Sequence, residues 1–70
     1  MPQGKVKWFN DKKGFGFVLL EGKEYFVHWL SIVTASDREE KTLSAGEAVE
    51  FDLLKTDKGV QAINVIRLKL

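Results

Sequence analysis

Two aromatic stretches organise this sequence: Lys13-Gly14-Phe15-Gly16-Phe17-Val18 and, after a short polar connection, Tyr25-Phe26-Val27-His28-Trp29. In an extended strand, successive side chains point to opposite faces, so every second residue of each stretch shares a face. Glycine at two positions of the first stretch lets another backbone, or a flat ligand, approach that strand closely. If the two strands are antiparallel neighbours, one face carries an aromatic cluster made of Phe15, Phe17, Phe26 and His28.

The composition is typical of a small globular protein. The chain has 70 residues, of which 44% are hydrophobic and 30% are charged. A chain of this length has room for one core, and we expect a single domain over residues 1–70. It has no cysteine and one histidine. Disulfides and thiolate metal sites are therefore excluded, and we expect neither a metal nor another cofactor.

The sequence shows no targeting or membrane segment. No apolar run approaches the roughly 20 residues that a membrane-spanning helix needs, and Met1-Pro2-Gln3-Gly4 does not open a signal peptide. We therefore expect a cytoplasmic protein. Its net charge of +1 is almost neutral, but residues 1–29 hold five lysines against three acidic residues. This small basic excess lies beside the aromatic stretches, and the second half of the chain is richer in acid.

Hydrophobic alternation predicts five strands. In the first, the adjacent Trp8 and Phe9 must break strict alternation or make both faces apolar. In the fourth, Val49, Phe51 and Leu53 alternate with acidic residues, so we assign Phe51 to the core. Polar, glycine-containing turns separate the members of each hairpin. The predicted strands are residues 5–10, 15–20, 25–29, 49–53 and 60–66.

Two regions leave alternatives open. In the fifth strand we choose Ile63 and Val65 for the inward face, although Val60, Ala62 and Ile66 permit another assignment. Between the third and fourth strands, residues 30–47 break the strand pattern, and Ser36-Asp37-Arg38-Glu39 has the form of a capping box. Either a short helical turn or an ordered loop fits there. The expected apolar anchors of this connection are Ile32 and Leu43.

Five strands with one longer connection after the third need closure to remove exposed edges. At this length, a five-stranded antiparallel Greek-key barrel achieves that closure. We therefore predict an all-β protein with this architecture.

Three motifs resemble those of bacterial-type cold-shock proteins: Gly4-Lys5-Val6-Lys7-Trp8-Phe9-Asn10, Lys13-Gly14-Phe15-Gly16-Phe17 and Phe26-Val27-His28. The resemblance is dense over residues 4–29 and continues more weakly over most of the chain. It implies an oligonucleotide-binding barrel (OB-fold) of the cold-shock domain type that binds single-stranded RNA or DNA. It further implies an RNA chaperone with roles in stress response and transcription regulation. The positions that it marks for nucleic-acid binding are Lys7, Trp8, Phe9, Lys13, Phe15, Phe17, Phe26 and His28.

The second half diverges from the family pattern. Trp29 stands where the family usually has phenylalanine, and we include it among the binding residues because it keeps a stacking surface. The segment Val33–Lys41 has no aromatic residue and is about three residues longer than usual, which puts one base subsite in question. Val60 occupies a position where proline is common.

Nucleic-acid binding gives a chemical reason for aromatic side chains next to lysines. Every base has a π face on which an aromatic ring can stack, and lysines neutralise phosphates. For Phe9 and Tyr25, a place in the core and a place on the binding surface are equally compatible with the sequence. His28 is best interpreted as a stacking and hydrogen-bonding group, because it lacks the partners of a metal site or a catalytic triad.

Three other functions are alternatives to that of a cold-shock protein. An RNA-recognition motif shares the start of the first stretch, but that fold needs two long helices, for which the sequence has no periodicity. A protein-interaction module that uses the exposed aromatic patch is the alternative kept. An enzyme is not expected, since no nucleophile has an identifiable histidine and carboxylate series. A monomer suits a domain whose apolar patch is already a ligand site.

Overall fold

The protein is all-β in the computed structural model, which describes residues 1–36 and 40–68. One short 3-10 helix, η1 (Trp29–Ser31), interrupts the strands. The strands are β1 (Gln3–Asn10), β2 (Phe15–Leu20), β3 (Lys23–His28), β4 (Ile32–Val33), β5 (Ala48–Thr56) and β6 (Gly59–Arg67). The five longer strands coincide with the five predicted ones, and β4 is a two-residue addition.

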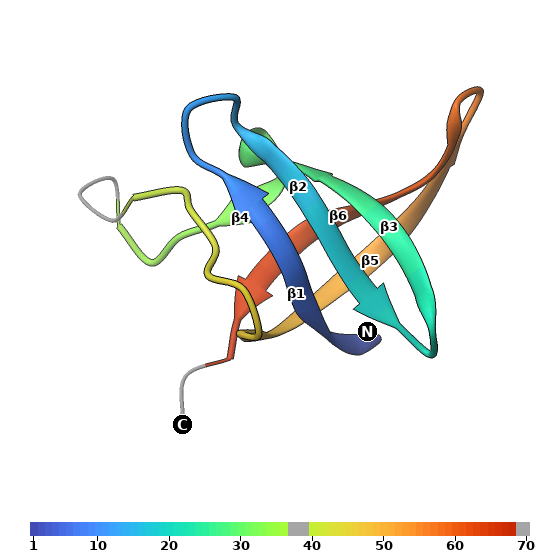
Figure 1. The fold of residues 1–70 in the computed structure, drawn as a ribbon, viewed down its shortest axis with the longest axis horizontal. Helices are drawn as coiled ribbons and strands as arrows, with labels where there is room; N and C mark the ends of the chain where they lie inside the picture. Colours follow the sequence, from blue (N-terminus) through green and yellow to red (C-terminus); the bar gives the residue numbers. More distant parts are fainter. Residues whose placement is uncertain (37–39, 69–70) are drawn as a thin grey trace.

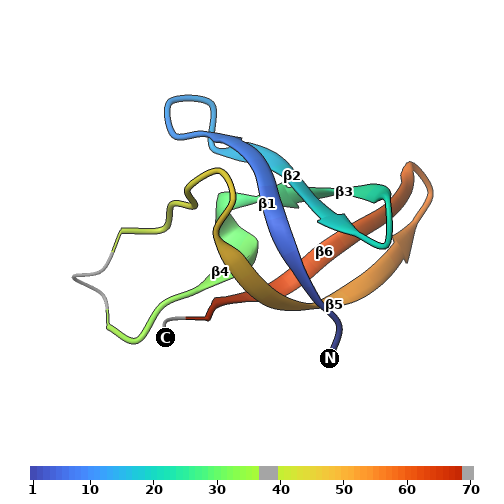
Figure 2. The ribbon, with the colours of Figure 1, turned by 60° about the horizontal axis from the view of Figure 1, so that its bottom comes forward.

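The strands form a closed barrel with the order β3-β2-β1-β5-β6-β4. The antiparallel pairs are β1–β2, β2–β3, β1–β5 and β5–β6, and a parallel pairing of β3 with β6 closes the barrel. Strand β4 also pairs parallel with β6. Figures 1 and 2 show β1, β2 and β3 as one layer lying across β5 and β6. The predicted barrel is confirmed, and the parallel closure explains how β3 and β6 avoid an open edge.

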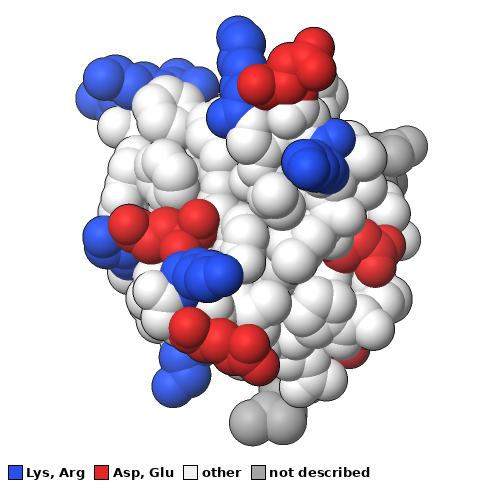
Figure 3. Space-filling view, turned by 90° about the vertical axis from the view of Figure 1, so that its right-hand side faces the viewer, with Lys and Arg blue, Asp and Glu red and all other residues white. Residues whose placement is uncertain are grey.

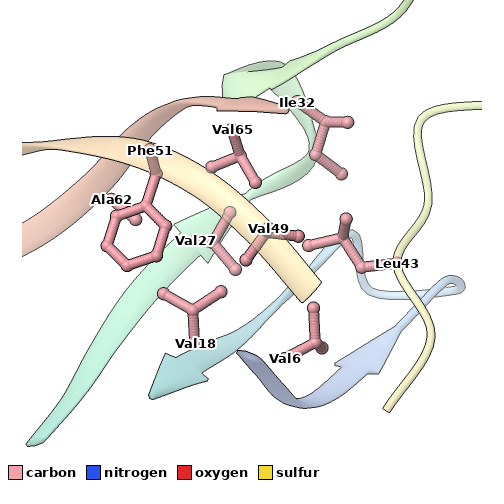
Figure 4. Close-up of a cluster of buried hydrophobic side chains, with 9 residues drawn as sticks. All are labelled: Val6, Val18, Val27, Ile32, Leu43, Val49, Phe51, Ala62 and Val65. Atoms are coloured by element: carbon pink, nitrogen blue, oxygen red, sulfur yellow. The ribbon is translucent and has the colours of Figure 1, made fainter. Parts of the chain in front are cut away.

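One cluster of buried side chains fills the barrel (Figure 4). Val18 and Val27 come from the inner faces of β2 and β3, and Phe51 reaches them from β5. Burying each such side chain contributes on the order of 1.5–3 kcal/mol. The expected anchors Ile32 and Leu43 both belong to the cluster, whose other members are Val6, Val49, Ala62 and Val65.

A bulge in β1 resolves the adjacent aromatic residues noted in the sequence. Val6 pairs with Val18, but Trp8 pairs with Phe17, so the register shifts between these positions. The extra residue moves Trp8 to the outer face with Phe17. A side chain on Gly16 would lie 2.2 Å from the carbonyl oxygen of Trp8, so this close crossing of β1 and β2 requires glycine.

The inward face of β6 differs from the predicted one. Val65 is buried as expected, but its buried partner is Ala62, and Ile63 is only partly buried. The reason is local backbone geometry: Asn64 adopts a positive φ of 51°, which interrupts the alternation of the strand. The Asn64 amide nitrogen donates to a carboxylate oxygen of Asp52 at 3.1 Å.

Two other expectations need correction. Trp29 does not extend the third strand, because β3 ends at His28 and Trp29 begins η1. Leu53 was expected to continue the buried alternation of β5, but it is exposed. It lies beyond the register shift of β5 between Glu50 and Asp52, where β5 and β6 continue into the hairpin that projects from the barrel (Figure 1).

In the connection between β4 and β5, the described residues 34–36 lead away from the barrel and residues 40–47 return to it near β1 (Figure 2). On the return, the Val6 amide donates to the Glu47 carbonyl at 2.9 Å, and the Gly46 amide donates to the Val6 carbonyl at 2.7 Å. The Thr42 hydroxyl donates to the Asp11 carboxylate, which ties this connection to the β1–β2 turn. Most of the proposed capping box, Asp37-Arg38-Glu39, lies outside the described residues.

Candidate functional site

Four aromatic rings from three strands form one cluster on the outer side of the β1–β3 layer. The Trp8 ring lies 5.8 Å from the Phe15 ring and 5.3 Å from the Phe17 ring, measured between centroids. Phe26 stacks on Phe15 at 5.7 Å and meets Phe17 edge-on at 6.0 Å. The register explains this proximity, because Phe17 pairs with Trp8 on one side and with Phe26 on the other.

His28 and Trp29 extend this cluster at one end. His28 pairs with Phe15 across β2 and β3, and its ring lies 5.7 Å from that of Trp29. His28 Nδ1 accepts a hydrogen bond from the Leu30 amide at 3.2 Å, so a neutral ring carries its proton on Nε2. We call the outer surface formed by Trp8, Phe15, Phe17, Phe26, His28 and Trp29 the aromatic face.

The rings of this face remain partly accessible to solvent. Trp8 and Trp29 are 37% and 41% exposed, and the three phenylalanines and His28 are intermediate. The same strands turn fully buried valines to the interior. Packing of the core therefore does not need the aromatic face, whose rings contact one another and water.

Gly14 positions Trp29. Its φ of +76° forms the end of the β1–β2 turn, and its carbonyl accepts a hydrogen bond from the Trp29 amide at 2.8 Å. A Cβ at Gly14 would lie 2.5 Å from Cδ1 of the Trp29 indole. Glycine is therefore required here both for the backbone conformation and for the space that Trp29 occupies.

Lysines lie at both ends of the aromatic face. At the end away from Trp29, Lys7 forms an ion pair with Glu24, and both side chains are about half exposed, at 47% and 46%. At the other end, Lys41 Nζ lies 5.8 Å from the centroid of the Trp29 ring, within the range of a cation–π interaction. Lys13 follows Asn10 in the β1–β2 turn, where its amide donates to the Asn10 side-chain oxygen at 2.9 Å.

Two hollows adjoin the aromatic face. The larger, of about 780 Å³, lies between Phe17 and Phe26 on one side and the β5–β6 hairpin, residues 56–61, on the other. The smaller, of about 490 Å³, lies at the Trp29 end and is lined by Asp11, Lys12, Lys13, Gly14, Trp29, Thr34, Glu40 and Lys41. The two hollows extend the surface available to a ligand beyond the rings themselves.

The surface charge is mixed. Figure 3 shows a broad uncharged area with lysine or arginine and acidic side chains interspersed around it, and neither sign forms a continuous patch. The part of the chain that the structure describes contains no group of three or more His, Cys, Asp or Glu side chains suited to a metal ion. Within the same residues, no helix has the length and apolar character needed to cross a membrane.

The structure brings together most of the predicted site residues. Trp8, Phe15, Phe17, Phe26, His28 and Trp29 share the aromatic face, with Lys7 and Lys13 near its ends. Phe9 is placed differently: it is partly buried and packs against the core cluster, as does Tyr25. The β1 bulge that turns Trp8 outward leaves Phe9 on the inner side.

Sequence reasoning did not identify Lys41 or the β5–β6 hairpin as parts of this site. Lys41 lies twelve positions after Trp29 in the sequence, and the hairpin lies more than twenty-five positions after Phe26. Only long-range folding brings these segments together. The sequence shows that residues 33–41 contain no aromatic residue, but it does not indicate that Lys41 lies beside Trp29.

Comparison with known proteins agrees with this geometry. Residues 2–68 match the family described as the 'Cold-shock' DNA-binding domain. The chain is 48% identical over 69 residues to cold shock protein CspA of Staphylococcus aureus, covering 97% of this chain and 100% of that protein. The corresponding protein of Staphylococcus saprophyticus is 46% identical, with the same coverage.

A solved structure shows the same fold at low sequence identity. The Drosophila Unr CSD456 structure superposes with a TM-score of 0.74 at 24% identity, covering 97% of this chain. The present chain spans 26% of that larger one. The family match extends over nearly the whole sequence, and the neighbour shares the barrel fold. The chain therefore belongs to the cold-shock DNA-binding domain family.

Proposed function

We propose that this protein binds single-stranded RNA or DNA on its aromatic face. The observation that carries the proposal is that rings from β1, β2 and β3 gather on one partly exposed surface that the core does not need. A cluster of this kind on a small protein is an association hazard unless it has a ligand. Unpaired bases fit it chemically, because they offer flat apolar faces that duplexes keep stacked inside.

Stacking, rather than long-range attraction, would supply most of the affinity. The net charge is +1, so the field of the whole protein draws a polyanion only weakly. Each base stacked on a ring is worth on the order of 1–3 kcal/mol by alanine substitution. Because every base has a π face, binding of this kind discriminates weakly between sequences.

The lysines would hold the backbone of the bound strand in place. Lys7 and Lys13 lie near opposite ends of the aromatic face and can each neutralise a phosphate. Lys7 must leave Glu24 to do so, and an exposed ion pair costs little to open, typically under about 1 kcal/mol. We therefore expect a moderate salt dependence that corresponds to a few phosphate contacts.

Such binding would act as an RNA chaperone. A ligand that binds only the unpaired form of an RNA shifts its folding equilibrium towards that form by its differential affinity. No nucleotide hydrolysis is needed. This role predicts that excess protein lowers the melting temperature of a short RNA hairpin whose ends carry a fluorophore and a quencher, while Phe17→Ala protein lowers it much less.

A fluorescence titration tests the binding itself. Trp8 and Trp29 both lie on the aromatic face, so stacking of bases should change their emission. We expect saturable quenching by a thymine-rich hexanucleotide and by the matching RNA, and little effect from duplex DNA. Unchanged emission at low salt, together with no mobility shift, would refute the proposal. Capture of a protein partner by a face that ignores nucleic acid would instead support the protein-interaction alternative.

A further inference from the structure

Lys41 lies beside the Trp29 ring at the smaller hollow. Its Nζ lies 5.8 Å from the ring centroid, and both residues line the hollow of about 490 Å³. The neighbouring residues hold this part of the connection in place, since Thr42 donates to Asp11 and Leu43 is buried in the core. The backbone at position 41 is thus anchored, while the long side chain keeps its freedom to swing.

Three lysines line the hollow. Lys12 and Lys13 belong to the β1–β2 turn and Lys41 to the connection between β4 and β5, and the hollow is also lined by Asp11 and Glu40. Among residues 1–36 and 40–68, none of the three lysines is ion-paired with a carboxylate, because the pairs there are Lys7 with Glu24 and Arg67 with Glu47. An anion would therefore displace no carboxylate partner from these lysines.

We propose, building on the proposed function, that this hollow is a phosphate-binding site for the nucleotide whose base stacks on Trp29. In the free protein Lys41 covers the ring. When a base arrives, the ammonium leaves the ring and joins Lys12 and Lys13 on the phosphate of that nucleotide. The Trp29 end of the face then binds by charge as well as by stacking, although residues 33–41 contribute no aromatic side chain.

The relative strengths of the two contacts favour this exchange. An exposed cation–π contact is weaker than the hydrogen bonds that ammonium groups donate to a charged phosphate. A phosphate held by three ammonium groups also releases condensed counterions, which the ring contact does not. At about 490 Å³, the hollow lies within the size range of small-ligand sites, roughly 300–1,000 Å³.

The test compares Lys41→Gln with Lys23→Gln. Both lysines are exposed, and Lys23 begins β3 at the end of the hairpin far from Trp29. The affinity of each protein for a fluorescein-labelled thymidine hexanucleotide is measured by anisotropy at several salt concentrations. We expect Lys41→Gln to bind about five-fold more weakly at 0.1 M salt and to lower the magnitude of the log–log salt slope by about 0.7, as loss of one phosphate contact predicts. Lys23→Gln should change both values less.

The outcomes separate this inference from the proposed function. Tighter binding by Lys41→Gln with an unchanged salt slope would mean that Lys41 only obstructs the ring, and it would overturn the phosphate site. Unchanged affinity and slope would overturn it equally. Either result leaves the proposed function standing as long as the wild-type protein binds the hexanucleotide. Failure of the wild-type protein to bind would refute the proposed function and the phosphate site together.

Discussion

The two faces of the β2–β3 hairpin differ in what they contact. On the inner face, Val18 and Val27 are 0% exposed and pack against Phe51 and the rest of the core. On the outer face, Phe17 and Phe26 pair across the same two strands but contact mainly other rings. Because side chains alternate along a strand, a residue that stabilises the core lies directly next to one with the proposed binding role. Substitutions on the two faces should affect different measurements.

The largest expected effect belongs to the inner face. Phe51→Ala removes the largest fully buried side chain, and such truncations cost about 3–5 kcal/mol of unfolding free energy. Leu54→Ala is the control, because Leu54 lies on the same strand but is 45% exposed. Urea denaturation measures both. Should Phe51→Ala fail to fold, Val27→Ala gives a graded loss, and equal losses at Val27 and Leu54 would contradict the assignment of the core.

A comparison of two glycines with similar backbone conformations tests whether Gly14 positions Trp29. Gly14→Ala and Gly22→Ala place a side chain at φ values of +76° and +80°, but only the Cβ at Gly14 meets another residue, the Trp29 indole. Both should lose about 1–2 kcal/mol of stability through left-handed backbone strain. Gly14→Ala should lose about 1–3 kcal/mol more through the clash.

Tryptophan emission and near-ultraviolet circular dichroism of the folded proteins provide a second readout for this pair. Displacement of the indole should change both signals in Gly14→Ala and leave them as in wild type in Gly22→Ala. Identical stability and spectra in the two variants would show that Gly14 does not position Trp29.

On the outer face, the effect should appear in binding. Phe17→Ala removes a ring that contacts both Trp8 and Phe26, and we expect its affinity for single-stranded DNA to fall by about 1–3 kcal/mol. Ile66→Ala removes an exposed apolar side chain from β6 that is not part of the aromatic face. Calorimetric titration with a thymidine hexanucleotide compares the two. A Phe17→Ala protein that is folded and binds like wild type would break the proposed division of roles.

The smallest effect concerns the two ion pairs. Arg67 and Glu47 are 2.8 Å apart and mostly buried, with side chains 23% and 18% exposed, while Lys7 and Glu24 are about half exposed. Loss of the first pair in Arg67→Gln should cost more than about 1 kcal/mol, and loss of the second in Lys7→Gln less than about 1 kcal/mol. Thermal unfolding measures the stability of both variants, and a greater loss of stability in Lys7→Gln than in Arg67→Gln would contradict this ranking.

Much of the fold follows from alternation in the sequence. Strict period two in Phe15–Val18 and Val49–Phe51 predicts which side chains enter the core, and the structure confirms it. Prediction was wrong where backbone geometry breaks the period. The positive φ of Asn64 moves burial from Ile63 to Ala62, and no glycine marks that position in the sequence.

The candidate site divides in the same way. The rings on β1–β3 are close in sequence and follow from strand pairing, so the sequence predicts their grouping. Lys41 and the β5–β6 hairpin reach the site through the barrel closure and the long connection. Contacts between such distant segments depend on the path of the chain, which local patterns do not encode. Phe9 was predicted to bind nucleic acid but packs against the core, because the β1 bulge places its neighbour Trp8 on the outer face.

Amide chemical-shift mapping tests the central claim most directly. Isotope-labelled protein is titrated with an unlabelled thymidine hexanucleotide, and the shift of each amide is followed to saturation. If the aromatic face is the binding surface, the largest changes will fall on residues 8, 14–17 and 26–29. Changes concentrated instead around Val33 and Ile66, or no saturable change at low salt, would contradict it.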